Sequence, residues 1–287
     1  MTANMTLPEL SLVAIDRIVD RALEEDLIGG DLTSEACIDA DRQAAADARA
    51  RGAIVACGGP VFARVFQRID PAIRVVMHAT EGAVMGKGAQ MWSVTGRARA
   101  ILMGERVALN FVQRMSGVAT LAHAFVSALP PGSKTRITDI RKTTPGLRAL
   151  ERYAVRAGGA HNHRDNLGSA VLIKDNHIAA CGGVRQAIER AFAYAPHTCK
   201  IECEVDTLEQ LDEALAAGAH IVLLDNMDTA TVALAVRRAR GKSLTEASGG
   251  VTLARVRELA EAGVDYISVG ALTHSAPAAD IGLDFRA

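Results

Sequence analysis

The sequence has few aromatic residues and almost no net charge, and both shortages restrict the functions it can have. Only 3% of its 287 residues are aromatic, which argues against a surface that stacks on nucleic-acid bases. The net charge is −1, so electrostatics give no reason to expect nucleic acid or an anionic membrane as a partner. No run of about 18 apolar residues is present, so no membrane span is expected. With 49% hydrophobic and 23% charged residues, the composition is that of an ordinary globular protein.

Cysteines are also few. Five are present, at irregular spacing, which favours free thiols in a reducing cytoplasm over a disulfide framework. Cys199 and Cys203 flank a strand-like segment and no second pair exists, so we interpret them as buried structural thiols and not as metal ligands. Residues 1–8 lack the basic and apolar segments of a signal peptide, and a cytoplasmic location is therefore expected.

The first third of the chain has a pattern different from the rest. Helical periodicity covers residues 10–27 and about 105–129, and strand-like runs lie at 53–57 and 73–77. The glycine pair in residues 86–88 has strands on both sides, so a hairpin turn is a better interpretation than a phosphate loop.

From residue 135 onward, strand-like runs alternate with helical patterns. Strand ends recur at intervals of about 21 residues, the length of one strand, loop and helix. Such βα repeats indicate an incomplete TIM-like barrel, with function on the loops that follow the strands. A doubly wound sheet is the rival, but no Gly-x-Gly-x-x-Gly follows a strand. The strand-like runs are residues 135–138, 171–173, 200–203, 221–224, 242–245 and 266–269, with helical patterns at 207–217, 229–239 and 252–262.

Basic residues follow the early strands of this series. Arg141, Lys142 and Arg148 come after the first strand, and residues 158–164 and 174–177 add two further basic groups. A lone cluster of this kind is usually a solvated loop. Several cations at one barrel mouth, however, would repel one another if they were left unpaired, so a polyanionic ligand is indicated. Arginine offers a planar fork to carboxylates and phosphates, and lysine offers a point charge.

Acidic residues follow the next two strands. Glu204 and Asp225 stand at successive strand ends, and Glu202 points the same way as Glu204 because strand side chains alternate. Both carboxylates can form ion pairs with nearby lysine or arginine. They can also share Mg²⁺, which takes one or two carboxylates together with phosphate oxygens and water.

Glycine-rich segments end the last two strands. Residues 246–250 and 269–271 allow backbone N–H groups to approach phosphate oxygens closely. Either segment alone is most simply a turn. As a consecutive pair in the last two βα loops of a barrel, they predict a phosphate site. Together, the strand ends indicate phosphoryl or phosphoribosyl chemistry.

These strand ends resemble those of the quinolinate phosphoribosyltransferase family over nearly the whole chain. Ile140 departs from the family pattern, which more often has threonine before the Arg-Lys pair. The motifs that carry the resemblance are residues 25–26, 30–34, 105–106, 110, 113–114, 141–148, 161–164, 172–177, 223–227, 246–250 and 268–275.

The resemblance implies a reaction and an architecture. Quinolinate and phosphoribosyl pyrophosphate would give nicotinate mononucleotide, pyrophosphate and CO2 in NAD biosynthesis, with Mg²⁺ as cofactor. The fold would be α/β: an N-terminal open sandwich of residues 1–118, joined by the tail 276–287, and a six- or seven-stranded barrel of residues 119–275. Arg106 would reach into the neighbouring subunit's site, so the working unit would be a homodimer or a higher homo-oligomer with shared active sites.

The resemblance also assigns roles to the residues. Those expected to bind the two quinolinate carboxylates are Arg141, His163, Arg164 and Lys174, with Arg106 from the partner subunit. Those expected to face the phosphoribosyl donor are Lys142, Glu204, Asp225, Ser248, Gly249, Gly250, Gly270 and Ala271. Glu204 and Asp225 would hold the metal, directly or through water, and the catalytic residues would be Lys142, Lys174, Glu204 and Asp225.

Two rival functions remain at this point. In an aldolase-type barrel Lys174 would form a Schiff base, which requires a lysine of depressed pKa. A non-catalytic paralogue linked to molybdate transport would keep the barrel without the chemistry, but such a protein has no need for so many unpaired cations.

Overall fold

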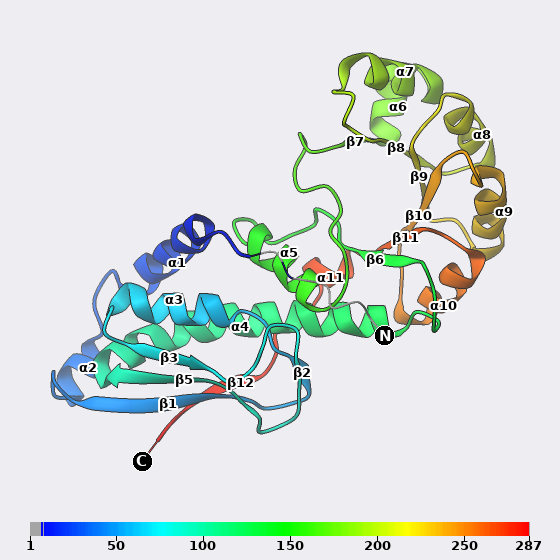
Figure 1. The fold of residues 1–287 in the computed structure, drawn as a ribbon. Helices are drawn as coiled ribbons and strands as arrows, with labels where there is room; N and C mark the ends of the chain where they lie inside the picture. Colours follow the sequence, from blue (N-terminus) through cyan, green and yellow to red (C-terminus); the bar gives the residue numbers. More distant parts are fainter. Residues whose placement is uncertain (1–6, 8, 287) are drawn as a thin grey trace. The chain divides into compact units, whose positions relative to one another are not determined.

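The computed structural model describes residue 7 and residues 9–286. Most of residues 1–8, in which no signal peptide was expected, lie outside these described residues. The chain divides into two compact units (Figure 1). The first comprises residues 1–123, 143–159 and 272–287, and the second comprises residues 124–142 and 160–271. Residues 143–159, which were expected in the barrel domain, therefore fall in the first unit. The tail, residues 276–287, also falls there.

The first unit is an antiparallel sheet with helices against it. Its four-stranded sheet has the order β12-β1-β5-β3. Figure 1 shows α3 and the long α4 lying alongside this sheet. The elements are α1 (Leu12–Leu27), α2 (Leu32–Cys37), β1 (Gln43–Ala50), β2 (Ile54–Val55), α3 (Gly59–Ile69), β3 (Arg74–Met77), β4 (Val84–Met85), β5 (Gln90–Arg97), α4 (Ala98–Ser127), α5 (Arg148–Ala157) and β12 (Ile281–Phe285).

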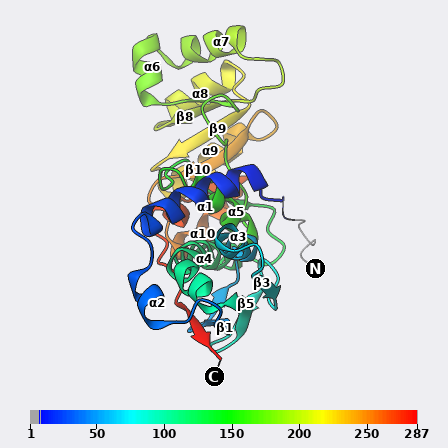
Figure 2. The ribbon, with the colours of Figure 1, turned by 90° about the vertical axis from the view of Figure 1, so that its left-hand side faces the viewer.

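Aromatic packing forms the centre of this unit. Phe62 and Phe66 of α3 are fully buried, and the Phe62 ring stacks on Trp92 of β5 at 5.2 Å between centroids. The contact joins the helix layer to the sheet, and aromatic pairs of this kind add to the burial of their apolar area. The helix α1 lies against α3 (Figure 2), where Asp16 and Asp20 form ion pairs with Arg64 and Arg68.

Two expectations for this unit are wrong. Residues 86–88 form a turn but not a hairpin, because β4 pairs with β2 in a separate two-stranded sheet whereas β5 pairs with β1 and β3. Two strand-like runs beside a glycine turn therefore do not pair with each other here. The helix expected from about residue 105 begins at Ala98, directly after β5.

The carboxyl-terminal tail completes the first sheet. β12 pairs with β1 in antiparallel register, with Ala48 opposite Leu283. Before it does so, the tail crosses α4 at Gly117. A Cβ atom there would overlap the carbonyl oxygen of Pro277 and lie 3.1 Å from the backbone nitrogen of Ala279. The close approach of the two segments thus requires glycine.

The second unit is a six-stranded parallel sheet of order β6-β11-β10-β9-β8-β7. Figure 1 shows α7, α8, α9 and α10 along one side of a curved row of strands. An incomplete α/β barrel is confirmed, and the described residues do not form a doubly wound sheet with helices on both faces. The elements are β6 (Arg136–Thr138), β7 (Val171–Ile173), α6 (Asp175–Cys181), α7 (Val184–Tyr194), β8 (Ile201–Val205), α8 (Leu208–Ala216), β9 (Ile221–Asp225), α9 (Thr229–Ala239), β10 (Leu244–Ser248), α10 (Leu253–Ala262), β11 (Tyr266–Ser268) and α11 (Ala271–His274), which crosses into the first unit.

One strand differs from the prediction in a way that affects the site. β10 covers Leu244–Ser248, not residues 242–245, because Lys242 and Ser243 still donate backbone hydrogen bonds to Ala239 at the end of α9. Glu246 consequently lies inside the strand and is buried. The strand end is Ser248, followed by two glycines.

All five cysteines are free thiols, as predicted. Cys203 is buried, as expected for a structural thiol. Cys199 is partly exposed and departs from the interpretation of a buried thiol. Among the described residues, no helix is long and apolar enough to cross a membrane.

We expect Gly117→Ala to lower the free energy of unfolding of the first unit by about 1–3 kcal/mol, because the added methyl group overlaps the backbone of the tail. The loss should appear even though alanine favours a helix by about 1 kcal/mol over glycine. Fluorescence of Trp92, the single tryptophan, in a urea titration measures it. Gly86→Ala is the control, since a Cβ at Gly86 meets nothing within 4 Å. Equal stability of both variants would contradict the packing argument.

Candidate active site

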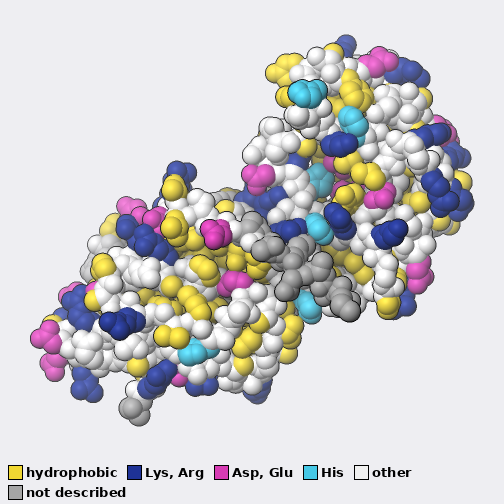
Figure 3. Space-filling model, in the orientation of Figure 1, with side chains coloured by type: hydrophobic (Ala, Val, Ile, Leu, Met, Phe, Trp, Pro, Cys, Tyr) yellow, Lys and Arg dark blue, Asp and Glu magenta, His cyan; other side chains and the backbone are white. Residues whose placement is uncertain are grey.

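The carboxyl-terminal edge of the parallel sheet gathers the predicted basic residues of the second unit. Arg141 and Lys142 follow β6, and Lys174 follows β7. The Arg141 side chain is half-buried, and its Nε has no hydrogen-bond partner among the described residues. A buried guanidinium nitrogen without a partner is costly unless a ligand meets it. The space-filling view shows basic, histidine and acidic side chains interspersed on this unit (Figure 3).

Asp139 joins the loop after β6 to the segment that carries His163 and Arg164. Its carboxylate is fully buried and accepts from the Asn162 amide and from the His163 backbone N–H, both at 2.7 Å. A parallel bridge between Thr138 and His161 continues the contact. The segment thus acts as a short extra strand beside β6.

Arg164 lies near a second cation. Burial and then the charge of Arg141 lower the pKa of Arg164, and the charge of Glu202 opposes them more weakly. Its Nη1 donates to the carbonyl of Ala170 at 3.0 Å, while Nε is buried without a hydrogen-bond partner in the described structure. Two arginines held this close to each other suit an anion of more than one charge.

His163 is directed at two buried carboxylates. Its Nε2 lies 3.1 Å from Oε2 of Glu202 and 3.5 Å from Oε1 of Glu246. Nδ1 accepts from the Arg164 backbone N–H at 2.7 Å, so in this geometry the imidazole proton sits on Nε2. Burial lowers the pKa of His163, but the hydrogen bond to Glu202 and the charge of Glu246 raise it more. Uptake of a second proton would replace the hydrogen bond from Arg164.

Glu246 is a buried carboxyl group of this cluster with a strongly raised pKa. Burial, and then the charge of Glu202, raise the pKa of Glu246 to about 8. Glu202 and Glu246 each have one oxygen that is buried without a hydrogen-bond partner among the described residues. At neutral pH Glu246 is therefore mostly protonated. These two residues and His163 can bring three ligand atoms within 4.8 Å of one another, although a metal ion would have to displace this proton.

Lys174 is not left unpaired, contrary to the argument from the sequence. Its Nζ donates to Oε2 of Glu204 at 2.6 Å. The ion pair that the sequence left as an alternative for Glu204 is therefore formed. The carboxylate stabilises the ammonium ion, whereas a Schiff-base lysine has to react as the free amine, so this pair disfavours the aldolase alternative.

The acidic and glycine-rich strand ends lie next to each other. Asp225 at the end of β9 is in register with Ser248 at the end of β10. Gly249 and Gly250 follow with φ of +90° and +53°. Left-handed glycines after a strand expose backbone N–H groups, as a phosphate site requires. Glu204 and Asp225, on neighbouring strands, are a donor set of carboxylate oxygens that fits Mg²⁺ with phosphate and water as further ligands.

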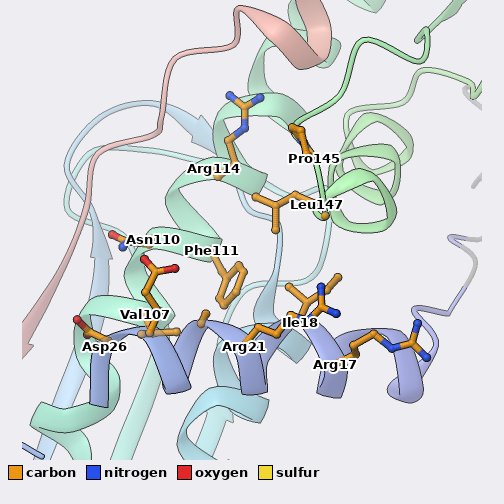
Figure 4. A pocket seen from close by; sticks show the side chains of 13 residues that line it. Arg17, Ile18, Arg21, Asp26, Val107, Asn110, Phe111, Arg114, Pro145 and Leu147 are labelled. Atoms are coloured by element: carbon orange, nitrogen blue, oxygen red, sulfur yellow. The ribbon is translucent and has the colours of Figure 1, made fainter. Parts of the chain in front are cut away.

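The first unit contains a cavity that the sequence did not reveal. It has a volume of about 640 Å³ and lies between α1, α4 and the turn at residues 145–147 (Figure 4). Arg17 and Arg21 of α1 and Asn110 and Arg114 of α4 line it. Arg106, which is exposed, lies four residues before Asn110 and therefore on the same face of α4.

Arg114 is fixed beside this cavity by a buried carboxylate. It donates to Oε1 of Glu151 at 2.8 Å and to the carbonyl of Ala276. Glu151 also accepts from the Thr144 backbone N–H at 3.0 Å. The Glu151 carboxylate thus anchors the loop that follows Arg141 and Lys142. Arg148 belongs to the same unit as this loop, and its side chain donates a hydrogen bond to Thr143.

The structure brings together most of the predicted residues of the second unit but adds others. From the sequence, Glu246 was expected only at the start of a glycine-rich strand end, and Glu202 only on the same side of its strand as Glu204. Their contacts with His163 depend on the pairing of distant segments, which no local pattern reveals. The alternation that placed Glu202 and Glu204 on one side was the available signal for one of them.

Comparison with protein-family models identifies the two halves of the chain. Residues 31–116 match the quinolinate phosphoribosyl transferase N-terminal domain, and residues 118–284 match the C-terminal domain. The chain belongs to the quinolinate phosphoribosyltransferase family. Family membership extends to both units, so the antiparallel sheet and the barrel are parts of one known architecture.

Individual relatives agree with this membership. The chain is 41% identical over 94% of its length to the probable nicotinate-nucleotide pyrophosphorylase (carboxylating) of Bacillus subtilis, 93% of which is covered. It is 43% identical to the nicotinate-nucleotide pyrophosphorylase (carboxylating) of Mycobacterium leprae, over 93% of this chain and 95% of the relative. The crystal structure of NadC from Streptococcus pyogenes superposes with a TM-score of 0.92 at 39% identity, covering 98% of this chain and all of that one (100%).

We expect Glu246→Gln to remove a pH dependence of stability. The folded protein binds a proton on Glu246 more tightly than the unfolded chain does, and this difference stabilises the fold. The stabilisation is complete below the ordinary pKa of 4.5 and is lost as the pH rises toward the folded-state pKa of about 8. Urea unfolding followed by circular dichroism at several pH values should show a flatter profile for the variant. Glu261→Gln, an exposed exchange on α10, is the control and should keep the wild-type slope. An unchanged slope in Glu246→Gln would exclude the raised pKa.

Proposed function

We propose that this chain transfers the phosphoribosyl group of phosphoribosyl pyrophosphate to quinolinate, giving nicotinate mononucleotide, pyrophosphate and CO2. The observation that carries the proposal is the division of one sheet edge into a cationic part and an acidic, glycine-rich part, in a chain of this family. Free cysteines also support a reducing compartment such as the cytoplasm as its place of work.

The cationic part suits the acceptor. Quinolinate carries two carboxylates on adjacent ring carbons. Arg141 and Arg164 would each offer a buried guanidinium Nε–H to them, and His163 would join by turning its Nε2–H from Glu202 to the substrate. Lys174 would join them by exchanging Glu204 for a substrate carboxylate, which also releases the Glu204 carboxylate toward the donor. Fixed donors that hold a flat dianion orient its ring nitrogen for attack.

The acidic part suits the donor. Lys142, Glu204 and Asp225 would face the phosphoribosyl pyrophosphate, and Ser248, Gly249, Gly250, Gly270 and Ala271 would bind its 5′-phosphate. Mg²⁺ held by Glu204 and Asp225 would neutralise charge on the departing pyrophosphate. The two carboxylates would also stabilise the positive charge that grows at the anomeric carbon.

The chemistry then follows from charge. The ring nitrogen forms a bond to the anomeric carbon while the bond to pyrophosphate breaks, which leaves the nitrogen quaternary. The adjacent carboxylate leaves as CO2, because the cationic ring stabilises the electron pair left behind, and a proton completes the ring carbon. No covalent bond to the protein is needed.

The first unit would complete the site of a second subunit. Arg106 is exposed on the cavity face of α4, and we propose that it reaches the quinolinate of the partner's barrel in a homodimer or a larger assembly.

The purified protein should release CO2 from quinolinate only when both phosphoribosyl pyrophosphate and Mg²⁺ are present. Capture of CO2 from carboxyl-labelled quinolinate measures this, and omission of each component is the control. If no CO2 is released when quinolinate, phosphoribosyl pyrophosphate and Mg²⁺ are all present, the proposed reaction is wrong and the non-catalytic alternative remains.

Arg106→Ala and Glu204→Ala should each be inactive, and mixing them should restore activity. A mixed dimer has one intact site, so random exchange gives about a quarter of the wild-type rate. Mixing Glu204→Ala with Lys174→Ala is the matched control, because both changes damage the barrel half and no intact site can form. The absence of recovery, when mass spectrometry shows that subunits have exchanged, would rule out a shared site.

A further inference from the structure

Asn226 adopts a backbone conformation that is unusual for its residue type. Its φ is +53°, and every other positive φ among residue 7 and residues 9–286 belongs to a glycine. Asparagine tolerates this left-handed region better than most residues, but glycine adopts it at lower cost. Asn226 is exposed, so burial of its side chain does not explain why the position is not a glycine. The contacts of the amide group are what remains to be explained.

Those contacts join the ends of two strands. The Asn226 side-chain amide donates from Nδ2 to Oδ2 of Asp225 at 2.6 Å, and its backbone N–H donates to the carbonyl of Ser248 at 3.1 Å. Asp225 and Ser248 are themselves paired in register between β9 and β10. One residue therefore orients a carboxylate and holds the neighbouring strand end.

The same side chain lies against the glycine turn. A Cβ atom on Gly249 would overlap Oδ1 of Asn226, and it would lie 2.6 Å from Cγ and 2.8 Å from the backbone nitrogen of that residue. Gly250 also has a positive φ, but a Cβ there meets nothing within 4 Å. The close packing is thus specific to Gly249, and it sets the distance between the Asp225 carboxylate and the turn.

We propose that Asn226 is a positioning residue for the phosphoribosyl donor. Its amide orients Asp225 and fixes the turn Ser248–Gly250 relative to that carboxylate. The inference rests on the proposed function, in which Asp225 meets the metal-bound pyrophosphate and the turn binds the 5′-phosphate. The pyrophosphate and the 5′-phosphate are attached to the same ribose. A fixed spacing between the Asp225 carboxylate and the turn therefore lowers the entropic cost of binding the donor.

Asn226→Gly removes the side-chain amide but keeps the backbone conformation, because glycine adopts left-handed φ values without strain. The variant therefore tests the contribution of the amide alone. We expect the KM for phosphoribosyl pyrophosphate to rise about tenfold, and the KM for quinolinate to stay within about twofold of the wild type. The melting temperature should not fall. Equal increases in both KM values, or an unchanged KM for the donor, would overturn the positioning role.

A binding measurement gives a readout that is independent of turnover. Calorimetry with phosphoribosyl pyrophosphate and Mg²⁺, without quinolinate, should show about tenfold weaker binding to Asn226→Gly than to the wild type, which is about 1.4 kcal/mol. The two proposals fail in different ways. A wild type that binds the donor but releases no CO2 overturns the reaction alone, whereas an active wild type matched by Asn226→Gly in donor affinity overturns this inference alone.

Two glycine variants test the contact itself. Gly249→Ala and Gly250→Ala both place a methyl group at a positive φ, but only the first meets Asn226. We expect Gly249→Ala to weaken donor binding more than Gly250→Ala. In the Gly249→Ala background, Asn226→Gly should cause less than its usual loss, since the two changes act on one contact. Full additivity, or a larger loss in Gly250→Ala, would contradict the coupling.

Discussion

Balance of charge at the edge of the parallel sheet is the constraint on which the second unit depends. Carboxylates of the chain itself hold part of this edge: Glu204 pairs with Lys174, Asp139 accepts from the His163 backbone N–H, and Glu202 lies against the imidazole Nε2 of His163. Under the proposed function, an anionic substrate would exchange with one of these carboxylates and would not enter an uncompensated positive field. Such exchange favours selectivity for ligands whose charges match in number and place.

The local pattern of the sequence predicted the parallel strands well, because each is a short apolar run with a distinctive end. It failed where pairing between distant segments decided the outcome. β4 pairs with β2 and not with its neighbour β5, and β10 starts two residues late because α9 ends in an extra turn. The site residues with unusual surroundings, Glu202 and Glu246, became evident only when strands β8 and β10 and the His163 segment were assembled.

Under the proposed function, donor and acceptor would be held by different kinds of element. The acceptor would meet side chains, chiefly Arg141, Arg164 and Lys174. The donor would also meet backbone at the end of β10, where Gly249 and Gly250 have left-handed conformations next to Asn226 and its hydrogen bond to Asp225. A turn of fixed geometry would orient the ribose, while the cations would take up the charge of the quinolinate carboxylates.

The pairing of β12 with β1 has a consequence for synthesis. β1 ends at Ala50, yet one of its two partners is Ile281–Phe285, almost the last residues of the chain. A ribosome therefore makes the entire barrel before the first sheet can be finished. Until then the free edge of β1 presents unpaired backbone groups, a condition that invites association with other strands. Synthesis of Ile281–Phe285, and not completion of the amino-terminal half, is therefore the step that allows the first sheet to close.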